Sequence, residues 1–225
     1  DQIYFVSNWV KKKFFEGLPY QYRNNCDILY PSIKQLNKMP KKEKIIIFSG
    51  KLNSSKGYDV FGKAIIKILD KHKDWHALAI GNEPREKHVF IHSRFKILDW
   101  IKHDDILKYY KKASISVVPS KWQEPFGRTA MESAAYGCST ITSKNGGLPE
   151  TFKNPIFIKA VNENELFKII NKLVIDNKLR KQTQNRNLRD VIHTIQKKVK
   201  KIDALKQHFL INKSNISKQR KFKIL

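Results

Sequence analysis

Residues 114–143, SISVVPSKWQEPFGRTAMESAAYGCSTITS, decide the fold class of this 225-residue chain. The β-branched run at 114–120 is typical of a buried strand, and residues 128–137 predict a helix that ends at its terminal glycine. The run at 139–143 predicts another strand. Strand, helix and strand at this spacing indicate a parallel sheet with helices on both faces, and such sheets bind ligands at the carboxyl ends of their strands.

The body of the chain repeats this alternation, so the expected fold is α/β with a Rossmann-like parallel sheet. Further strands are expected at 3–7, 26–33, 44–50 and 75–82, with one or two more within 89–101. Helices are expected at 9–18, 60–72 and 104–113, and longer helical stretches at 164–182 and 191–211.

The charge of the chain is strongly positive, with 45 Lys and Arg against 20 Asp and Glu, a formal net charge of +25. Such an excess suggests nucleic acid, an anionic membrane or a phosphate-bearing ligand, although biased codon usage produces the same excess. Residues 168–225 hold 17 basic residues against 3 acidic ones. The Lys-rich face of the 191–211 helix is either solvated or in contact with anionic lipid headgroups.

Several classes of protein are not expected from this sequence. No run approaches the roughly 20 apolar residues of a membrane-spanning helix, and the N-terminus lacks the pattern of a signal peptide. Cys26 and Cys138 provide neither a disulfide framework nor zinc spacing, which indicates a cytoplasmic setting. No helix-turn-helix, zinc or aromatic-platform motif supports nucleic-acid binding. Five histidines without ligand spacing are interpreted as surface or packing residues: His72, His76, His88, His92 and His103.

Residues 45–61, IIIFSGKLNSSKGYDVF, form the first stretch that carries chemistry. A strand ends at Gly50, and a polar loop containing Lys51 and Lys56 leads to a helix. The two ammonium groups can converge on one anion, to which the helix N-terminus adds N–H donors. The loop is not a P-loop, and by itself the stretch favours a solvated polar loop over an anion site.

The loop before the 128–137 helix forms the second stretch. Glu124 follows the strand, and Glu132 lies one helical turn beyond Arg128 on the same face. Both carboxylates can face one crevice, with the backbone N–H groups near Gly127 between them. Such N–H groups suit a diphosphate, and carboxylates accept hydrogen bonds from sugar hydroxyls. In the third stretch, STITSKNGGLPETF at 139–152, paired glycines allow either close approach to a ligand or a tight turn.

Taken in order, these stretches resemble glycosyltransferase family 4, the retaining nucleotide-sugar transferases of GT-B fold. The specific parts are Glu124 and Glu132 separated by seven residues, Pro-Phe-Gly after the first Glu, and GGLPETF. SGKLNSSKG and AIGN also match. FVSNWVKKKF resembles the end of the family's N-terminal domain, and CDILYPSI resembles its interdomain connection. The resemblance covers roughly residues 3–190.

The resemblance implies a role for each matching residue. Lys51 and Lys56 would bind the donor diphosphate, Glu124 would lie beside the transferred sugar, and Glu132 would accept hydrogen bonds from ribose. The family usually has Arg where this chain has Lys51, so a point charge replaces a bidentate fork. The implied catalytic residues are Glu124, Lys51 and Lys56. The implied donor-binding residues are Gly50, Asn82, Phe126, Gly127, Arg128 and Glu132. No metal and no cofactor beyond the UDP- or GDP-linked donor is implied.

The resemblance also implies a division of the chain. Residues 1–40 would be a remnant of the N-terminal domain and linker, 41–190 the nucleotide-sugar-binding domain, and 191–225 a basic amphipathic helix and tail. The chain is shorter than a two-domain member, so it is expected to be a donor-binding half, the C-terminal half of a GT-B fold. The implied reaction transfers sugar to a saccharide or lipid-linked hydroxyl acceptor, for cell-surface polysaccharide, lipopolysaccharide or glycolipid, at the inner face of the cytoplasmic membrane. The alternative is a non-catalytic nucleotide-sugar-binding or interaction module.

Overall fold

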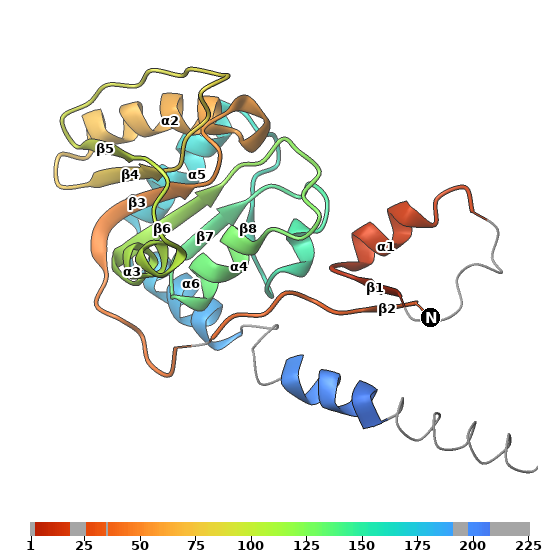
Figure 1. The fold of residues 1–225 in the computed structure, drawn as a ribbon. Coiled ribbons are helices and arrows are strands. Elements are labelled where there is room, and N and C mark those ends of the chain that lie inside the picture. The colour runs from red at the N-terminus through yellow and green to blue at the C-terminus, as the bar shows by residue number, and fades with distance from the viewer. Residues whose placement is uncertain (1–2, 19–25, 35, 191–197, 208–225) are drawn as a thin grey trace, which may run out of the picture.

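The computed structural model describes residues 3–18, 26–34, 36–190 and 198–207. Its centre is a six-stranded, all-parallel sheet in the order β5-β4-β3-β6-β7-β8 (Figure 1). The strands are β3 Glu43–Ser49, β4 His76–Ile80, β5 Phe95–Leu98, β6 Ala113–Val118, β7 Ser139–Thr142 and β8 Ile156–Phe157. Successive strands are added outward from β3 on one side and from β6 on the other. Doubly wound sheets bind ligands where the order reverses in this way, here between β3 and β6.

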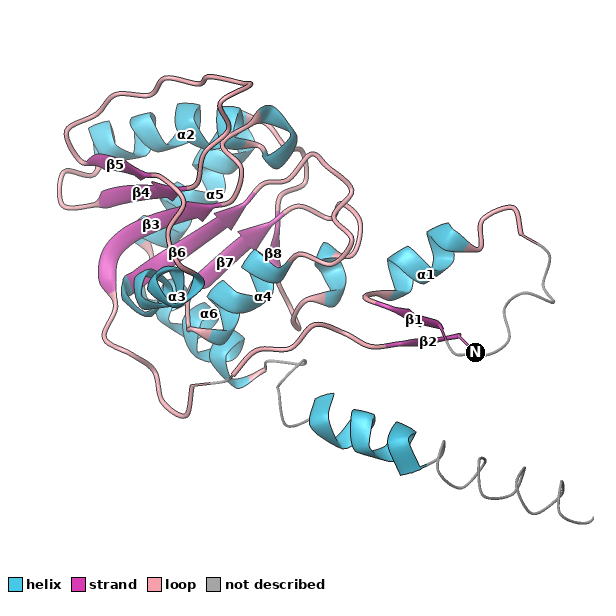
Figure 2. Cartoon of the chain, in the orientation of Figure 1, coloured by secondary structure: helices cyan, strands magenta, loops and turns pink. Residues whose placement is uncertain are grey.

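Helices cover both faces of this sheet, which gives the three layers visible in Figure 2. The helices are α2 Tyr58–Lys71, α3 His103–Lys112, α4 Arg128–Ala135, α5 Glu163–Ile175 and α6 Asn177–Arg189. Ile46 and Phe48 of β3 pack in one apolar cluster with α2 and α5, whereas Ile47 packs in the opposite cluster with α3 and α4. Side chains alternate along a strand, so a sheet covered on both faces requires the nearly continuous apolar run seen in β3.

A smaller unit precedes the sheet domain and lies to one side of it in Figure 1. It consists of β1 Ile3–Phe5, α1 Asn8–Phe14 and β2 Cys26–Ile28, with β1 and β2 paired in parallel. Phe5, Phe15 and Ile28 form its apolar cluster. A helix at 198–207 reaches this unit, since Lys201 Nζ lies 2.9 Å from Asp27 Oδ2. The two ends of the described chain therefore meet at β2.

The expected α/β fold with a parallel sheet is confirmed, with two differences. The 164–182 stretch is not one helix, because the backbone at Asp176 leaves helical geometry and its carboxylate caps α6 at Leu179 N. The region 89–101 contains the single strand β5, and the short β8 was not anticipated. Of the expected 191–211 helix, residues 198–207 are helical, and the remainder of it and the basic tail lie outside the described residues.

Candidate functional site

A cavity of about 400 Å³ lies at the carboxyl ends of β3 and β6, where the strand order reverses. Its walls are the end of β3 at Gly50, the loop that follows β6, and the first turn of α4. Val6 and Pro31 contribute from the smaller N-terminal unit. The cavity thus occupies the position that the topology alone marks for a ligand.

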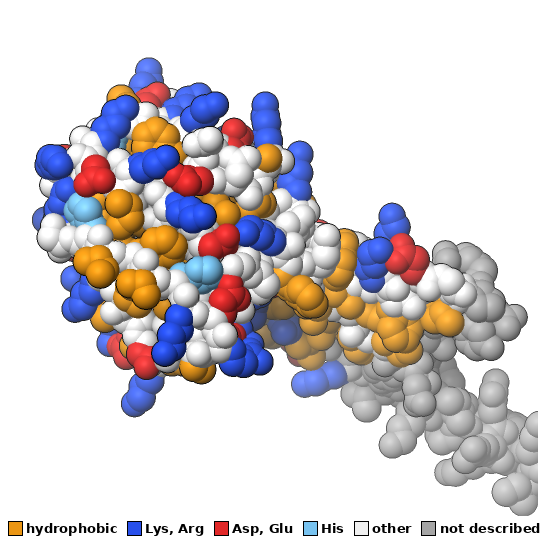
Figure 3. All heavy atoms as spheres, turned by 90° about the horizontal axis from the view of Figure 1, so that it is seen from above, with side chains coloured by type: hydrophobic (Ala, Val, Ile, Leu, Met, Phe, Trp, Pro, Cys, Tyr) orange, Lys and Arg blue, Asp and Glu red, His pale blue; other side chains and the backbone are white. Residues whose placement is uncertain are grey.

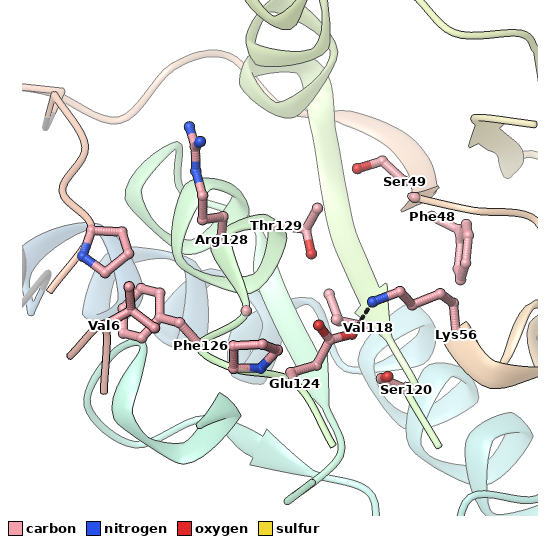
Figure 4. A pocket seen from close by; sticks show the side chains of 14 residues that line it. Val6, Phe48, Ser49, Lys56, Val118, Ser120, Glu124, Phe126, Arg128 and Thr129 are labelled. Carbon is pink, nitrogen blue, oxygen red and sulfur yellow. Dashed lines mark hydrogen bonds and ion pairs between the residues drawn. The ribbon is translucent and has the colours of Figure 1, made fainter. Parts of the chain in front are cut away.

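Lys56 and Glu124 both line this cavity and are in contact with each other, as Figure 4 shows. Lys56 Nζ lies 2.6 Å from Glu124 Oε1, and the two side chains are 29% and 13% exposed. One group follows β3 and the other follows β6, so they are brought together only by the pairing of these two strands. A cation and an anion that both remain accessible can bind a charged ligand and its hydroxyl groups.

The loop that carries Lys56 is held in place by side chains from the segment after β4. Asn53 Oδ1 accepts a hydrogen bond from Lys56 N at 3.1 Å and so caps the short helix η2 Ser54–Lys56. Glu86 accepts hydrogen bonds from both the backbone N–H and the hydroxyl of Ser54. These contacts, together with a hydrogen bond from His88, hold the pKa of Glu86 below its usual value. Glu86 was not singled out from the sequence, although its place just beyond a strand end is a usable signal.

A second carboxylate of the same segment also braces the loop. Glu83 is buried, accepts hydrogen bonds from both Arg85 nitrogens that face it, and lies 3.4 Å from Asn53 Nδ2. The Arg85 guanidinium lowers the pKa of Glu83 to about 2, with a smaller contribution from the positive charge of Lys51. Glu83 is therefore a fixed negative charge close to the lysine loop.

Glu124 is supported from the loop that follows β7. Gly147 N donates to Glu124 O at 2.7 Å, and Glu124 and Gly146 form a parallel β-bridge. A Cβ on Gly146 would lie 2.1 Å from Glu124 O, and Gly146 has a φ of +68°. The paired glycines of GGLPE thus permit close approach to the Glu124 backbone, a protein contact that was neither of the two alternatives left by the sequence.

The turn into α4 presents backbone N–H groups to the cavity. Gly127 has a φ of +104°, in the region that favours glycine, and it forms no side-chain cap for the helix. The first N–H groups of an uncapped helix have no intrahelical acceptor, so at Arg128 and Thr129 they are free for an anion. Phe126 is buried against Tyr30, with 5.8 Å between ring centroids, and anchors the turn.

Only some of the predicted site residues line the cavity. Gly50, Lys56, Glu124, Phe126, Gly127 and Arg128 line the cavity. Lys51 and Asn82 are exposed and do not line it, so their roles remain predictions. Glu132 does not line this cavity either, so the crevice that it was expected to share with Glu124 remains a prediction.

Glu132 is instead held by two basic side chains. Its carboxylate is 5% exposed, and Oε1 accepts hydrogen bonds from His103 Nε2 at 3.0 Å and from Arg128 at 3.1 Å. The Arg128 contact matches the expected i,i+4 geometry. His103 was interpreted as a surface or packing residue, and its contact with Glu132 was missed because it joins α3 to α4 across 29 positions of sequence.

The N-terminal unit also contacts the site through Glu150. Its carboxylate accepts hydrogen bonds at 2.8 Å from the backbone N–H groups of Asn8 and Trp9 and from the Tyr30 hydroxyl. Burial and the adjacent carboxylate raise the pKa of Tyr30. Ser7 donates to the carbonyl of Pro125, beside Glu124. The first turn of α1 is thereby fixed to the loops around the cavity.

The described residues provide neither a metal site nor a membrane-spanning helix. Among them, no group of three or more His, Cys, Asp or Glu side chains could hold a metal ion. Within the same part of the chain, none of the helices combines the length and the apolar character needed to cross a bilayer. Cys26 and Cys138 are not joined in a disulfide, and burial raises the pKa of Cys138.

Comparison with known proteins identifies the family. The family model described as glycosyl transferases group 1 matches residues 31–190, so the chain belongs to this family. An uncharacterized glycosyltransferase of Methanocaldococcus jannaschii is 29% identical over 158 residues, which is 66% of this chain and 40% of that protein. The chain thus spans well under half the length of that relative.

Two solved structures share the fold. A glycosyltransferase from Rickettsia africae has a TM-score of 0.74 at 20% identity, with 93% of this chain and 64% of that chain covered. HepE from Anabaena has a TM-score of 0.71 at 15% identity, with 92% and 63% covered. These similarities agree with the parallel six-stranded sheet flanked by helices and with a GT-B glycosyltransferase fold.

Proposed function

We propose that this chain is the donor-binding portion of a retaining glycosyltransferase that uses a nucleotide-diphosphate sugar. The observation that carries the proposal is the Lys56–Glu124 pair beside the uncapped N-terminus of α4, at the reversal in strand order. The cation and the helix N-terminus can bind a diphosphate, and the carboxylate can accept hydrogen bonds from sugar hydroxyls. HepE, which shares the fold, was solved with UDP and glucose, and this supports a UDP-type donor.

In the proposed reaction the C1–O bond to the diphosphate breaks and the acceptor oxygen adds to C1 on the same face. The leaving phosphate oxygen takes the proton of the acceptor hydroxyl. Lys56 and the N–H groups at Arg128 and Thr129 stabilise the charge that develops on the diphosphate. Glu124 stabilises the oxocarbenium-like sugar from beside the ring, and Lys51 supplies a further positive charge at the loop.

The wider setting of the reaction is also a proposal. We place the transfer on the cytoplasmic side of the membrane, with a saccharide or lipid-linked acceptor for surface polysaccharide, lipopolysaccharide or glycolipid. Nucleic acid is not the expected partner. On the face shown in Figure 3, Lys and Arg side chains are dispersed among acidic and apolar ones.

Calorimetric titration of the full chain with UDP, GDP and their sugar conjugates tests the proposal. Micromolar to millimolar binding of one nucleoside diphosphate, competed by its sugar conjugate, is expected. Joined to an N-terminal GT-B domain, the chain should transfer sugar with retention of anomeric configuration, which is read by NMR of the product. Absence of nucleotide binding would reject the proposal. Binding without transfer or donor hydrolysis would identify a non-catalytic module instead.

A further inference from the structure

His103 is the first residue of α3. Its Nε2 lies 3.0 Å from Glu132 Oε1, although the two residues belong to different helices. Arg128 reaches the same oxygen at 3.1 Å from the first turn of α4. Two donors from two helices therefore meet on one atom of a carboxylate that is almost fully buried.

The second oxygen of that carboxylate, Oε2, differs from Oε1 in its hydrogen bonding. No donor among the described residues reaches Glu132 Oε2. Oε2 is also not among the buried side-chain atoms that lack a hydrogen-bond partner in this part of the chain, so it retains contact with solvent. A buried carboxylate with one oxygen fully bonded and the other open is oriented to accept from something outside the protein.

The donors themselves lie at the surface. The His103 and Arg128 side chains are 47% and 62% exposed, against 5% for Glu132. In Figure 4 the Arg128 side chain points away from the Lys56–Glu124 pair. The carboxylate and its two donors thus form a second polar cluster, between α3 and α4.

We infer that His103 is a positioning residue for the ribose-binding role that the family resemblance implies for Glu132: with Arg128 it fixes Glu132 Oε1 and leaves Oε2 open to a ribose hydroxyl. This inference rests on the proposed function, because it assumes a nucleoside diphosphate whose phosphates lie at Lys56. The physical reason is preorganisation. A carboxylate locked by two donors loses little rotamer freedom on binding and keeps its charge where the hydroxyl arrives.

The test compares ligands that differ only in the ribose, titrated into the full chain by calorimetry. The probes are UDP, 2′,3′-dideoxy-UDP and inorganic pyrophosphate. For His103→Ala we expect about tenfold weaker binding of UDP, with pyrophosphate unchanged and the preference for UDP over the dideoxy compound largely lost. His103→Gln, which retains an N–H donor, should restore most of that preference. In a Glu132→Gln background, His103→Ala should add almost no further loss.

The matched control is Asp105→Asn, which removes an exposed ion pair with Lys108 on the same helix and should leave all three affinities unchanged. Equal weakening of UDP and pyrophosphate by His103→Ala would show a structural role and overturn the inference. An unchanged UDP preference in both His103→Ala and His103→Gln would also overturn it. If the parent chain binds neither UDP nor GDP, the proposed function fails and the inference fails with it. Near-UV circular dichroism verifies that each variant is folded.

Discussion

Lys56 Nζ forms an ion pair with Glu124 Oε1 at 2.6 Å, across the point where the order of the strands reverses. Each of the two side chains therefore competes with any ligand that binds the other. A diphosphate must draw Lys56 away from Glu124, and a sugar hydroxyl must find the Glu124 carboxylate still available. The contributions of Lys56 and Glu124 to ligand binding can therefore be distinguished by substituting each residue in turn.

Lys56→Ala should weaken UDP binding by about 10- to 100-fold, because a charge-assisted contact to phosphate is lost. The matched control is Lys44→Ala, which removes an ion pair with Asp74 near the opposite, amino end of β3. Calorimetry with UDP should show the loss in the first variant only. Equal affinities in both variants would exclude Lys56 from the phosphate site.

Glu124→Gln should have opposite effects on two ligands. UDP alone should bind a few-fold more tightly, because Lys56 no longer has a carboxylate partner to leave. The UDP-sugar should gain less or bind more weakly, because its hydroxyls lose a charged acceptor. The ratio of the two dissociation constants is the measurement, and an unchanged ratio would place Glu124 away from the sugar.

Glu150→Gln should loosen the N-terminal unit, because a charged acceptor for the N–H groups of Asn8 and Trp9 becomes neutral. Hydrogen exchange of these two amides should accelerate by about tenfold, while the amides of β3 remain protected. Glu16→Gln is the control, since Glu16 pairs with Lys13 on the surface of the same unit. Acceleration in the control of the same size would argue against a specific role of Glu150.

The ionisation of Glu83 should make the free energy of unfolding depend on pH. The Arg85 guanidinium lowers its pKa from 4.5 to about 2, so the ionised group stabilises the native state. That contribution is complete above pH about 4.5 and is lost as the pH falls toward 2. The free energy of unfolding of the parent should exceed that of Glu83→Gln at neutral pH, with a gap that narrows below pH 4.5. A gap that stays constant down to pH 3 contradicts the assignment.

Gly127→Ala should destabilise the fold by about 2–4 kcal/mol, since it combines backbone strain with a collision. Gly127 has a φ of +104°, and a Cβ there would lie 2.4 Å from Leu148 Cδ2. Gly17 has a φ of +84° with nothing within 4 Å, so Gly17→Ala isolates the strain and should cost about 1 kcal/mol. Chemical denaturation measures both, and equal costs would mean that the Leu148 contact is easily relieved.

Much of the fold follows from local patterns in the sequence. The apolar run of β3 and the small residues of α4 are signals that depend only on neighbours a few positions apart. The break at Asp176 was missed because an Asp inside an amphipathic pattern reads equally well as a surface residue or as a cap. The two residues of β8 are too few to produce a pattern.

The site was only partly accessible from sequence. Glu124 and Lys56 could be selected because each follows a predicted strand and matches a family motif. Their ion pair could not be predicted, since it depends on β3 and β6 being neighbours although 63 residues lie between the two strands. The same holds for His103 and Glu132, which are joined by the packing of α3 against α4.

The sequence alone therefore determined the parallel α/β architecture and a short set of residues at the carboxyl ends of strands. Both follow from short-range periodicity and from residue types, which are written locally in the chain. Only the tertiary structure decided that Glu124 bonds with Lys56 and not with Lys51, and that Glu132 is held by His103 outside the cavity. Those choices depend on strand order and helix packing, in which residues far apart in sequence compete for one partner.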